Sequence, residues 1–204
     1  MIESILFTWL QGADFYRDLH QCAVQSLPPG SGKTWLDVGC GPGLVTRLAA
    51  EHGYRAQGVD TNPRMIKAAQ RLALKHHASA KFAVGDIAAS SLSADVASAA
   101  SLLAVLEDKL AGLHALWRCV NSGGHLLIIE PTARMNPANT KTIIASGLPQ
   151  KRIYGLRLWA AMRQNRAVDP ALFDGLTSER RYIELLQGLA GAWIFEKPCA
   201  PVSH

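Results

Sequence analysis

The sequence has little cysteine and no long hydrophobic run. Its four cysteines stand far apart without a C-x-x-C pair, which argues against a disulfide framework or a zinc site. No uninterrupted apolar run approaches the roughly 18 residues of a membrane span. The acidic start, Met1 to Ser4, does not resemble a secretory signal. We therefore expect a cytoplasmic protein without a bound metal.

Internal repeats, low-complexity tracts and clustered metal ligands are also lacking. Hydrophobic residues make up 49% of the 204 residues and charged residues 18%. This composition supplies enough apolar material for a sizeable core and excludes a largely disordered chain. The length fits one domain with some decoration.

Acidic residues are missing from one stretch of the chain. Up to Glu130, 11 basic residues balance 11 acidic ones, whereas the remainder has 10 against 5 and carries the whole net charge of +5. Seven basic residues and no acidic one lie between Pro131 and Val168: Arg134, Lys141, Lys151, Arg152, Arg157, Arg163 and Arg166. This segment is either a solvated basic face or a surface for anions, nucleic acid or membrane headgroups.

Strand-like and helix-like segments alternate from Trp35 to Thr132. A mostly parallel, doubly wound α/β sheet follows from that alternation. The expected strands are 35–38, 56–60, 81–86, 95–100 and 125–130, with helices over 44–52, from Asn62-Pro63 onward, and over 108–120, and a turn at 122–124. Asn62 is expected to cap its helix, with Pro63 in the first turn.

Acidic residues gather where these strands end. Asp37, Asp60, Asp86 and Glu130 each close a predicted strand, and a glycine-rich loop follows the first one. Ligands of doubly wound sheets bind beyond the carboxyl ends of the strands. We therefore expect the functional site at this edge.

The glycine loop, Asp37-Val38-Gly39-Cys40-Gly41-Pro42-Gly43, admits three interpretations. A dinucleotide fingerprint fails because its last glycine position is Leu44. A phosphate-binding loop at Gly32-Lys33-Thr34 fails because that segment precedes the first strand. The third interpretation is the cofactor loop of class I S-adenosylmethionine-dependent methyltransferases.

Four segments in order resemble that methyltransferase family, including its small-molecule, quinone-biosynthesis-like members. The loop resembles the first motif, [DE]-x-G-x-G-x-G, and Gly58-Val59-Asp60 resembles the acidic end of the second strand. Gly85-Asp86-Ile87 resembles the third motif, and Leu116 to Leu126 resembles the helix, turn and strand that follow. The resemblance covers about residues 10 to 132 and implies a Rossmann-like fold that uses S-adenosylmethionine.

The resemblance also implies which residues bind the cofactor. Asp37 would hold the ammonium group, Asp60 the ribose hydroxyls, and Asp86 the adenine amine beside Ile87. The loop would pass close to the methionyl and ribose portions because glycine has no Cβ. The full predicted set is Asp37, Gly39, Cys40, Gly41, Gly43, Asp60, Thr61, Asp86, Ile87, Ala100 and Ser101, with the last two lining the methyl-transfer side.

The acceptor side departs from the quinone-biosynthesis members, which often carry His, Arg or Asn after the fourth strand. Here Leu102 to Leu106 is wholly apolar. The candidates for a catalytic role are His20, Glu130 and Tyr16, and the catalytic residue stays open because role depends on geometry. Alignment in a dry pocket is the main task of the protein in methyl transfer, and a base helps only some nucleophiles.

A single domain is expected over residues 1–204, with a helical cap inserted after the fifth strand. It divides into an N-terminal helical segment (1–30), a cofactor-binding core (35–132), a helical cap (133–176) and a C-terminal helix and strand (177–204). The cap includes a basic helix over 150–164 that also carries aromatic and aliphatic residues. The final helix is expected over 179–188 and the closing strand over 192–197.

Three functions are compatible with these features. The leading hypothesis is a methyltransferase for a small-molecule acceptor, acidic or lipophilic, held between the N-terminal helix and the cap. An RNA or protein methyltransferase that uses the basic 131–168 segment is the runner-up, since no separate RNA-binding module is visible. The third is a catalytically silent cofactor-binding protein. A peripheral membrane contact is compatible with the basic helix; the acceptor and the oligomeric state stay open.

Overall fold

The computed structural model describes residues 14–87, 91–145, 147, 150–177 and 179–199. The expected helix from Ile2 therefore lies partly outside the described residues, and its described part begins at Asp14. Among the residues that the structure describes, no helix is long and apolar enough to cross a membrane.

Strands and helices alternate as the sequence predicts over the described residues from Asp14 to Pro131. In chain order the elements are α2 (Asp14–Gln25), β1 (Thr34–Val38), α3 (Leu44–Glu51), β2 (Arg55–Asp60), α4 (Pro63–Lys75), β3 (Lys81–Val84), β4 (Ala94–Ala100), η2 (Leu103–Val105), α5 (Lys109–Arg118) and β5 (Val120–Pro131). They are followed by α6 (Pro137–Ala145), α7 (Gln150–Arg163), η3 (Pro170–Phe173), β6 (Arg180–Leu185), η4 (Leu186–Gly188) and β7 (Ala190–Glu196).

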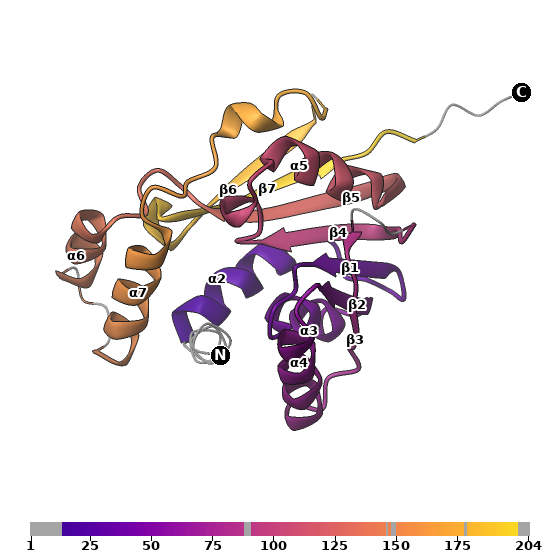
Figure 1. The fold of residues 1–204 in the computed structure, drawn as a ribbon, viewed down its shortest axis with the longest axis horizontal. Helices are drawn as coiled ribbons and strands as arrows, with labels where there is room; N and C mark the ends of the chain where they lie inside the picture. Colours follow the sequence, from indigo (N-terminus) through magenta and orange to yellow (C-terminus); the bar gives the residue numbers. More distant parts are fainter. Residues whose placement is uncertain (1–13, 88–90, 146, 148–149, 178, 200–204) are drawn as a thin grey trace, which may run out of the picture.

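The strands form one sheet in the order β3-β2-β1-β4-β5-β7-β6. The strands β1 to β5 are parallel to one another, whereas β7 runs antiparallel to β5 and to β6. Helices α2, α3 and α4 cover one face and α5 lies on the other (Figure 1). This arrangement confirms the doubly wound, Rossmann-like methyltransferase fold.

The segment expected as the last helix is a strand, which corrects the prediction over 179–188. Its apolar residues suit a helical spacing, but Arg180 to Leu185 pairs along its whole length with β7. The Tyr182 ring packs on Trp193 with ring centroids 5.1 Å apart. Cross-strand pairing and this aromatic contact outweigh local propensity, which is weak for strands. The C-terminal part therefore consists of two strands instead of a helix and a strand.

The turn expected at 122–124 lies inside β5. The pairing of β5 with β4 shifts register between Ala94 and Val96, so the extra residues bulge without ending the strand. Gly123 has φ of 71°, and a Cβ on Gly124 would lie 2.5 Å from the carbonyl oxygen of Asp95. Glycine is needed at Gly123 because its φ is positive, and at Gly124 because the backbone passes close to β4.

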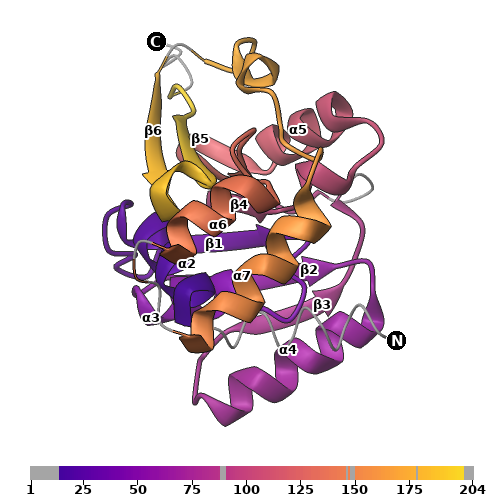
Figure 2. The same ribbon diagram turned by 90° about the vertical axis from the view of Figure 1, so that its left-hand side faces the viewer.

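Strand β5 divides the core between the two faces of the sheet. Leu127 and Ile129 pack into the cluster beneath α2 and α3, and Leu126 and Ile128 into the cluster beneath α5. On the first face, Trp159 of α7 packs edge-on against Tyr16 of α2, with ring centroids 5.3 Å apart. Helix α7 therefore lies across the carboxyl ends of the parallel strands, beside α2 (Figures 1 and 2).

Candidate active site

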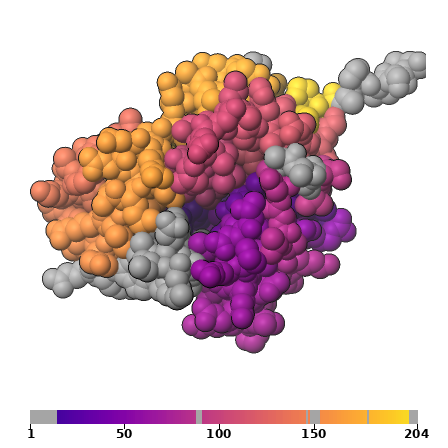
Figure 3. Space-filling model, in the orientation of Figure 1, coloured from indigo at the N-terminus to yellow at the C-terminus, as the bar shows by residue number. Residues whose placement is uncertain are grey.

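A cavity of about 700 Å³ opens at the carboxyl ends of the parallel strands, in the size range of small-molecule sites. The molecular surface is hollowed there, between the orange α7 and the purple N-terminal half (Figure 3). Twelve of the sequence-predicted residues line it: Tyr16, His20, Asp37, Gly39, Cys40, Gly41, Asp60, Thr61, Asp86, Ile87, Ala100 and Ser101. The structure thus brings most of the predicted site together, whereas Gly43 and Glu130 lie outside its lining.

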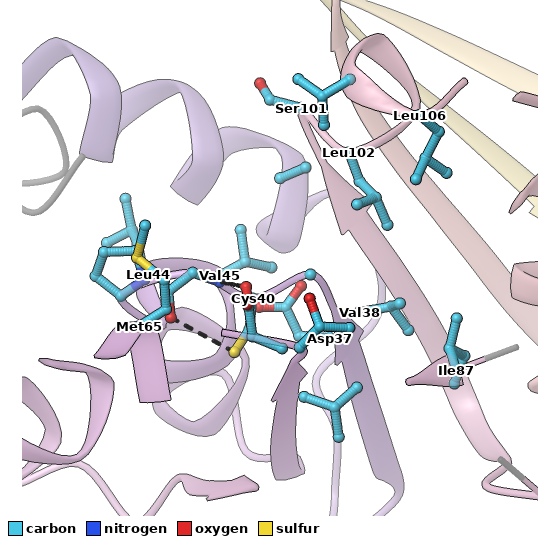
Figure 4. Close-up of a pocket in the computed structure, with 18 of the residues that line it drawn as sticks. Asp37, Val38, Cys40, Leu44, Val45, Met65, Ile87, Ser101, Leu102 and Leu106 are labelled. Carbon is cyan, nitrogen blue, oxygen red and sulfur yellow. Dashed lines mark hydrogen bonds between the residues drawn. The ribbon is translucent and has the colours of Figure 1, made fainter. Parts of the chain in front are cut away.

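The glycine loop turns sharply between β1 and α3. Gly39 and Gly41 have φ of 64° and 50°, in the left-handed region where glycine is favoured. A Cβ on Gly39 would lie 2.8 Å from Cδ1 of Leu102, so the loop passes closely under the opposite wall. Asp37 and Cys40 lie between the two walls of the cavity, with Leu102 on one of them (Figure 4).

Gly43 has a packing role instead of a place in the cavity. It stands in front of α3 with φ of 79°, and a Cβ there would lie 2.4 Å from Cε1 of Phe82 in β3. Glycine is therefore required for close helix–sheet packing at this position. Arg47, one turn into α3, donates from Nη1 to the Pro42 carbonyl at 2.7 Å and secures the loop from below.

The carboxylate of Asp37 is buried at the end of β1 and is held by two hydroxyl groups. Ser98 donates to Oδ1 at 2.8 Å and Thr46 donates to Oδ2 at 2.7 Å. Ser98 in turn accepts a hydrogen bond from Nε1 of Trp35 at 2.8 Å. Burial raises the pKa of Asp37 to about 6, and the two hydroxyls partly oppose that rise. The side chain is fixed in position and carries a negative charge at neutral pH.

Asp60 ends β2, and its carboxylate binds the backbone of the glycine loop. Its Oδ2 accepts from the Gly41 amide at 2.9 Å, and its Oδ1 accepts from the Asn62 amide at 2.8 Å. Asn62 caps α4 by accepting from the Arg64 amide, with Pro63 in the first turn, as the sequence predicts. Each carboxylate oxygen keeps a second acceptor position, so Asp60 can also accept from a ligand's hydroxyl groups.

The other predicted lining residues complete the cavity around this centre. Asp86 and Ile87 follow β3, and Thr61 follows β2. Ser101 follows β4 with φ of 54°, although it is not a glycine, and its amide donates to the Ile129 carbonyl at 2.8 Å. A non-glycine residue with a positive φ is strained, and such residues often occur at functional sites. Ser101 and Leu102 form the wall opposite Val45 and Met65 (Figure 4).

Tyr16 and His20 reach the cavity from α2. Both are buried, and their rings pack with centroids 4.3 Å apart. Burial raises the pKa of Tyr16 to about 12, although Arg163 and the Ser101 hydroxyl oppose that rise. Burial lowers the pKa of His20 to about 4, so its ring is neutral at physiological pH.

The tautomer of His20 follows from its hydrogen bond. Nδ1 lies 2.6 Å from the carbonyl oxygen of Tyr16, which can only accept, so Nδ1 carries the proton. A neutral ring then leaves Nε2 unprotonated. His20 therefore brings a hydrogen-bond acceptor to the wall of the cavity.

Glu130 holds the neighbouring turn from behind the cavity. It is buried at the end of β5, and its Oε1 accepts from the Leu103 amide at 2.7 Å. Burial raises its pKa to about 8, although this hydrogen bond and Arg163 lower it. Glu130 thus fixes the turn η2, which carries Val105 of the cavity wall, and its own side chain is not part of the cavity lining.

The sequence placed the acceptor beside the cap but did not identify which residues of α7 reach the cavity. Met162 and Arg163 at its end, and Arg166 just beyond it, line the cavity. Arg163 is only 5% exposed, and burial lowers its pKa. The run of basic residues without an acid was the available signal, but it did not distinguish these two from Arg157 on the exposed face of the same helix.

Comparisons with known proteins show the family to which the chain belongs. A family model described as a methyltransferase domain matches residues 9–177. The ubiquinone biosynthesis O-methyltransferase of Ralstonia nicotianae is 28% identical over 109 residues, 50% of this chain and 45% of that protein. The malonyl-(acyl-carrier protein) O-methyltransferase of Salmonella typhimurium is 29% identical over 173 residues, 79% of this chain and 66% of that protein. The chain thus spans between about half and two thirds of these two relatives.

Solved structures share the fold at low sequence identity. A proposed S-adenosyl-L-methionine-dependent methyltransferase of Methanococcus maripaludis superposes with a TM-score of 0.66 at 15% identity, covering 98% of this chain and 94% of that one. The magnesium protoporphyrin IX methyltransferase of Synechocystis, solved with bound SAH, gives 0.60 at 17% identity, covering 87% and 83%. With a family model matched over most of its length and with the cavity described above, the chain belongs to the class I S-adenosylmethionine-dependent methyltransferases.

Proposed function

We propose that this methyltransferase acts on a small-molecule acceptor bound between the glycine loop, α2 and α7. The observation that carries the proposal is that one cavity runs from the strand-end carboxylates to Tyr16, Ser101 and Met162. A site of this volume suits a cofactor and a compact second molecule. The two curated relatives are O-methyltransferases by name, which supports a small acceptor.

The residues at the strand ends fit S-adenosylmethionine, which supplies an electrophilic methyl group on a sulfonium sulfur. We assign the buried carboxylate of Asp37 to the ammonium group, because a fixed acceptor-only side chain pairs well with a cation. Asp60 accepts from the ribose hydroxyls, and Asp86 accepts from the adenine amine beside Ile87. Gly39 and Gly41 leave space for the methionyl part because no Cβ projects from them.

The acceptor side aligns the nucleophile and excludes water. Leu102, Val105 and Leu106 form an apolar wall there, and Glu130 supports it through the Leu103 amide. Such a wall favours a desolvated nucleophile held in line with the methyl group. If the nucleophile is a hydroxyl or an amine, it donates a hydrogen bond to Nε2 of His20. We therefore expect His20 and Tyr16 to orient the acceptor, and Glu130 to act only as a positioning residue.

The RNA or protein methyltransferase receives less support from the described residues. Two of the seven basic residues, Arg163 and Arg166, line the cavity instead of forming an outer face. Arg134, Lys141 and Arg157 are exposed. These three keep nucleic acid as a second candidate partner, and an affinity for RNA that falls steeply with salt is its signature.

The test is to incubate the protein with S-adenosylmethionine labelled on the methyl group and to follow the label. Small hydroxy, carboxy and amino compounds, total RNA and a protein mixture are offered in separate reactions. We expect label in a small molecule and release of S-adenosylhomocysteine, both lost in Asp60→Ala. Label in RNA or protein would contradict the proposal. Binding of the cofactor without transfer to any of these acceptors would favour a catalytically silent protein.

A further inference from the structure

The charges that line the cavity are separated by sign. The three carboxylates, Asp37, Asp60 and Asp86, follow β1, β2 and β3. Both guanidinium groups, Arg163 and Arg166, come from the end of α7 and the loop after it. The first set fits the cationic cofactor, which leaves the second set available for the acceptor.

At the α7 end of the cavity, the described lining residues carry a net positive charge. Burial lowers the pKa of Arg163, and the charges of Tyr16, Glu130 and Arg166 also act on it. Burial raises the pKa of Glu130 to about 8 and that of Tyr16 to about 12, so both are mainly neutral at pH 7. The chain between Pro131 and Val168 adds no acidic residue. A guanidinium in such a place favours an oxyanion, which it can bind through two parallel hydrogen bonds.

Apolar side chains also line the cavity. Val105 belongs to η2, Leu102 and Leu106 flank it, Leu116 comes from α5, and Met162 precedes Arg163 on α7. Figure 4 shows Leu102 and Leu106 on the same wall as Ser101, which follows β4. A ligand that satisfies both regions has an anionic group and an apolar body.

We propose that Arg163 and Arg166 form an oxyanion subsite, which binds the carboxylate or phosphate of an acceptor whose apolar body lies against Leu106 and Met162. This inference rests on the proposed function, because it assigns the acceptor end of the same cavity. It defines the substrate class as amphiphilic anions and distinguishes them from neutral or cationic compounds of the same size.

The test is calorimetric titration of the protein saturated with S-adenosylhomocysteine, using octanoate, octyl phosphate, octan-1-ol and octylamine as probes. The four probes share one apolar chain and differ in their polar group. We expect saturable binding of at least one anion, at least tenfold tighter than octan-1-ol or octylamine. The preference between octanoate and octyl phosphate then identifies the oxyanion.

Three variants assign the effect to this subsite. Arg163→Met keeps the length of the side chain and removes its charge, and we expect about ten- to a hundredfold weaker binding of the anion. Arg166→Met changes an exposed residue, so it tests the same subsite without disturbing the core. Arg157→Met, on the exposed face of α7 and outside the cavity lining, is the matched control and should bind the anion as the wild type does.

Two results would overturn the subsite. One is that neither anion binds more tightly than octan-1-ol, and the other is that both Arg163→Met and Arg166→Met bind the anion as tightly as the wild type. Saturation with S-adenosylhomocysteine is measured first in each variant. A wild-type protein that does not bind S-adenosylhomocysteine would contradict the proposed function itself. A wild-type protein that binds S-adenosylhomocysteine but no anion would contradict only the subsite.

Discussion

Replacing Glu130 by glutamine should remove a pH dependence of the free energy of unfolding. Folding raises the pKa of this carboxyl from 4.5 to about 8 because the group is fully buried. Between these two values the folded state keeps a proton that the unfolded state releases, so stability is present at low pH and is lost as pH rises toward 8. His20 opposes this trend only below its ordinary pKa of 6.5, because folding lowers its pKa to about 4.

In the interval from pH 6.5 to pH 8, Glu130 makes the largest contribution to this pH dependence. Asp37 contributes little there, because its pKa in the folded protein is about 6. At 1.36 kcal/mol for each unit of pKa, the wild type should lose about 2 kcal/mol across this interval. Glutamine matches the protonated carboxyl in size and still accepts from the Leu103 amide, so Glu130→Gln should show almost no loss.

The assay is urea unfolding at several pH values between 6.5 and 8, followed by tryptophan fluorescence. Glu184→Gln, which changes an exposed carboxyl on β6, is the matched control and should keep the slope of the wild type. Wild-type stability that stays constant or rises with pH would refute the reasoning. An unchanged slope in Glu130→Gln would refute the assignment to this residue.

Three further predictions concern single residues. Gly43→Ala should destabilise the fold by at least about 2 kcal/mol, because its Cβ would meet Phe82 and φ is positive there. A Cβ at Gly175 would meet no other atom, so Gly175→Ala is the control and should unfold like the wild type in a urea titration. The affinity for S-adenosylhomocysteine should fall as pH drops below about 6, because Asp37 then takes up a proton. Calorimetry should find that Asp37→Asn binds this compound weakly at every pH. If the affinity of the wild type and of Asp37→Asn depended on pH in the same way, the assignment of Asp37 to the ammonium group would be contradicted. Nitrogen-15 NMR should find Nε2 of His20 unprotonated down to about pH 5, and a ring that titrates near 6.5 would contradict the buried tautomer.

The parallel half of the fold and its cofactor edge could be predicted because the signals there are local. Buried strands ending in Asp37, Asp60 and Asp86 alternate with helices of regular spacing, and parallel strands place their carboxyl ends together. The cap of α4 by Asn62 follows from its residue type alone. Twelve of the fourteen residues predicted for the site consequently line one cavity.

The errors arose where distant contacts decide the structure. The segment from Arg180 to Leu185 is a strand only because β7 pairs with it, and its own spacing also fits a helix. Gly43 belongs to the cofactor motif in sequence, and its close packing against Phe82 of β3 could not be read from that motif. Arg163 reaches the cavity from α7, whose Trp159 packs on α2, far away in the sequence.

Calorimetric titration with S-adenosylmethionine and S-adenosylhomocysteine, on the wild type and on Asp60→Ala, tests the central claim most directly. The variant Asp174→Ala, which removes only an exposed ion pair with Arg180, is the control. We predict that the wild type and the control bind both compounds, and that Asp60→Ala binds them at least about tenfold more weakly, because it loses the ribose hydrogen bonds and the anchor of Gly41. A wild-type protein that binds neither compound, or equal binding by Asp60→Ala, would contradict the assignment of this cavity to the cofactor.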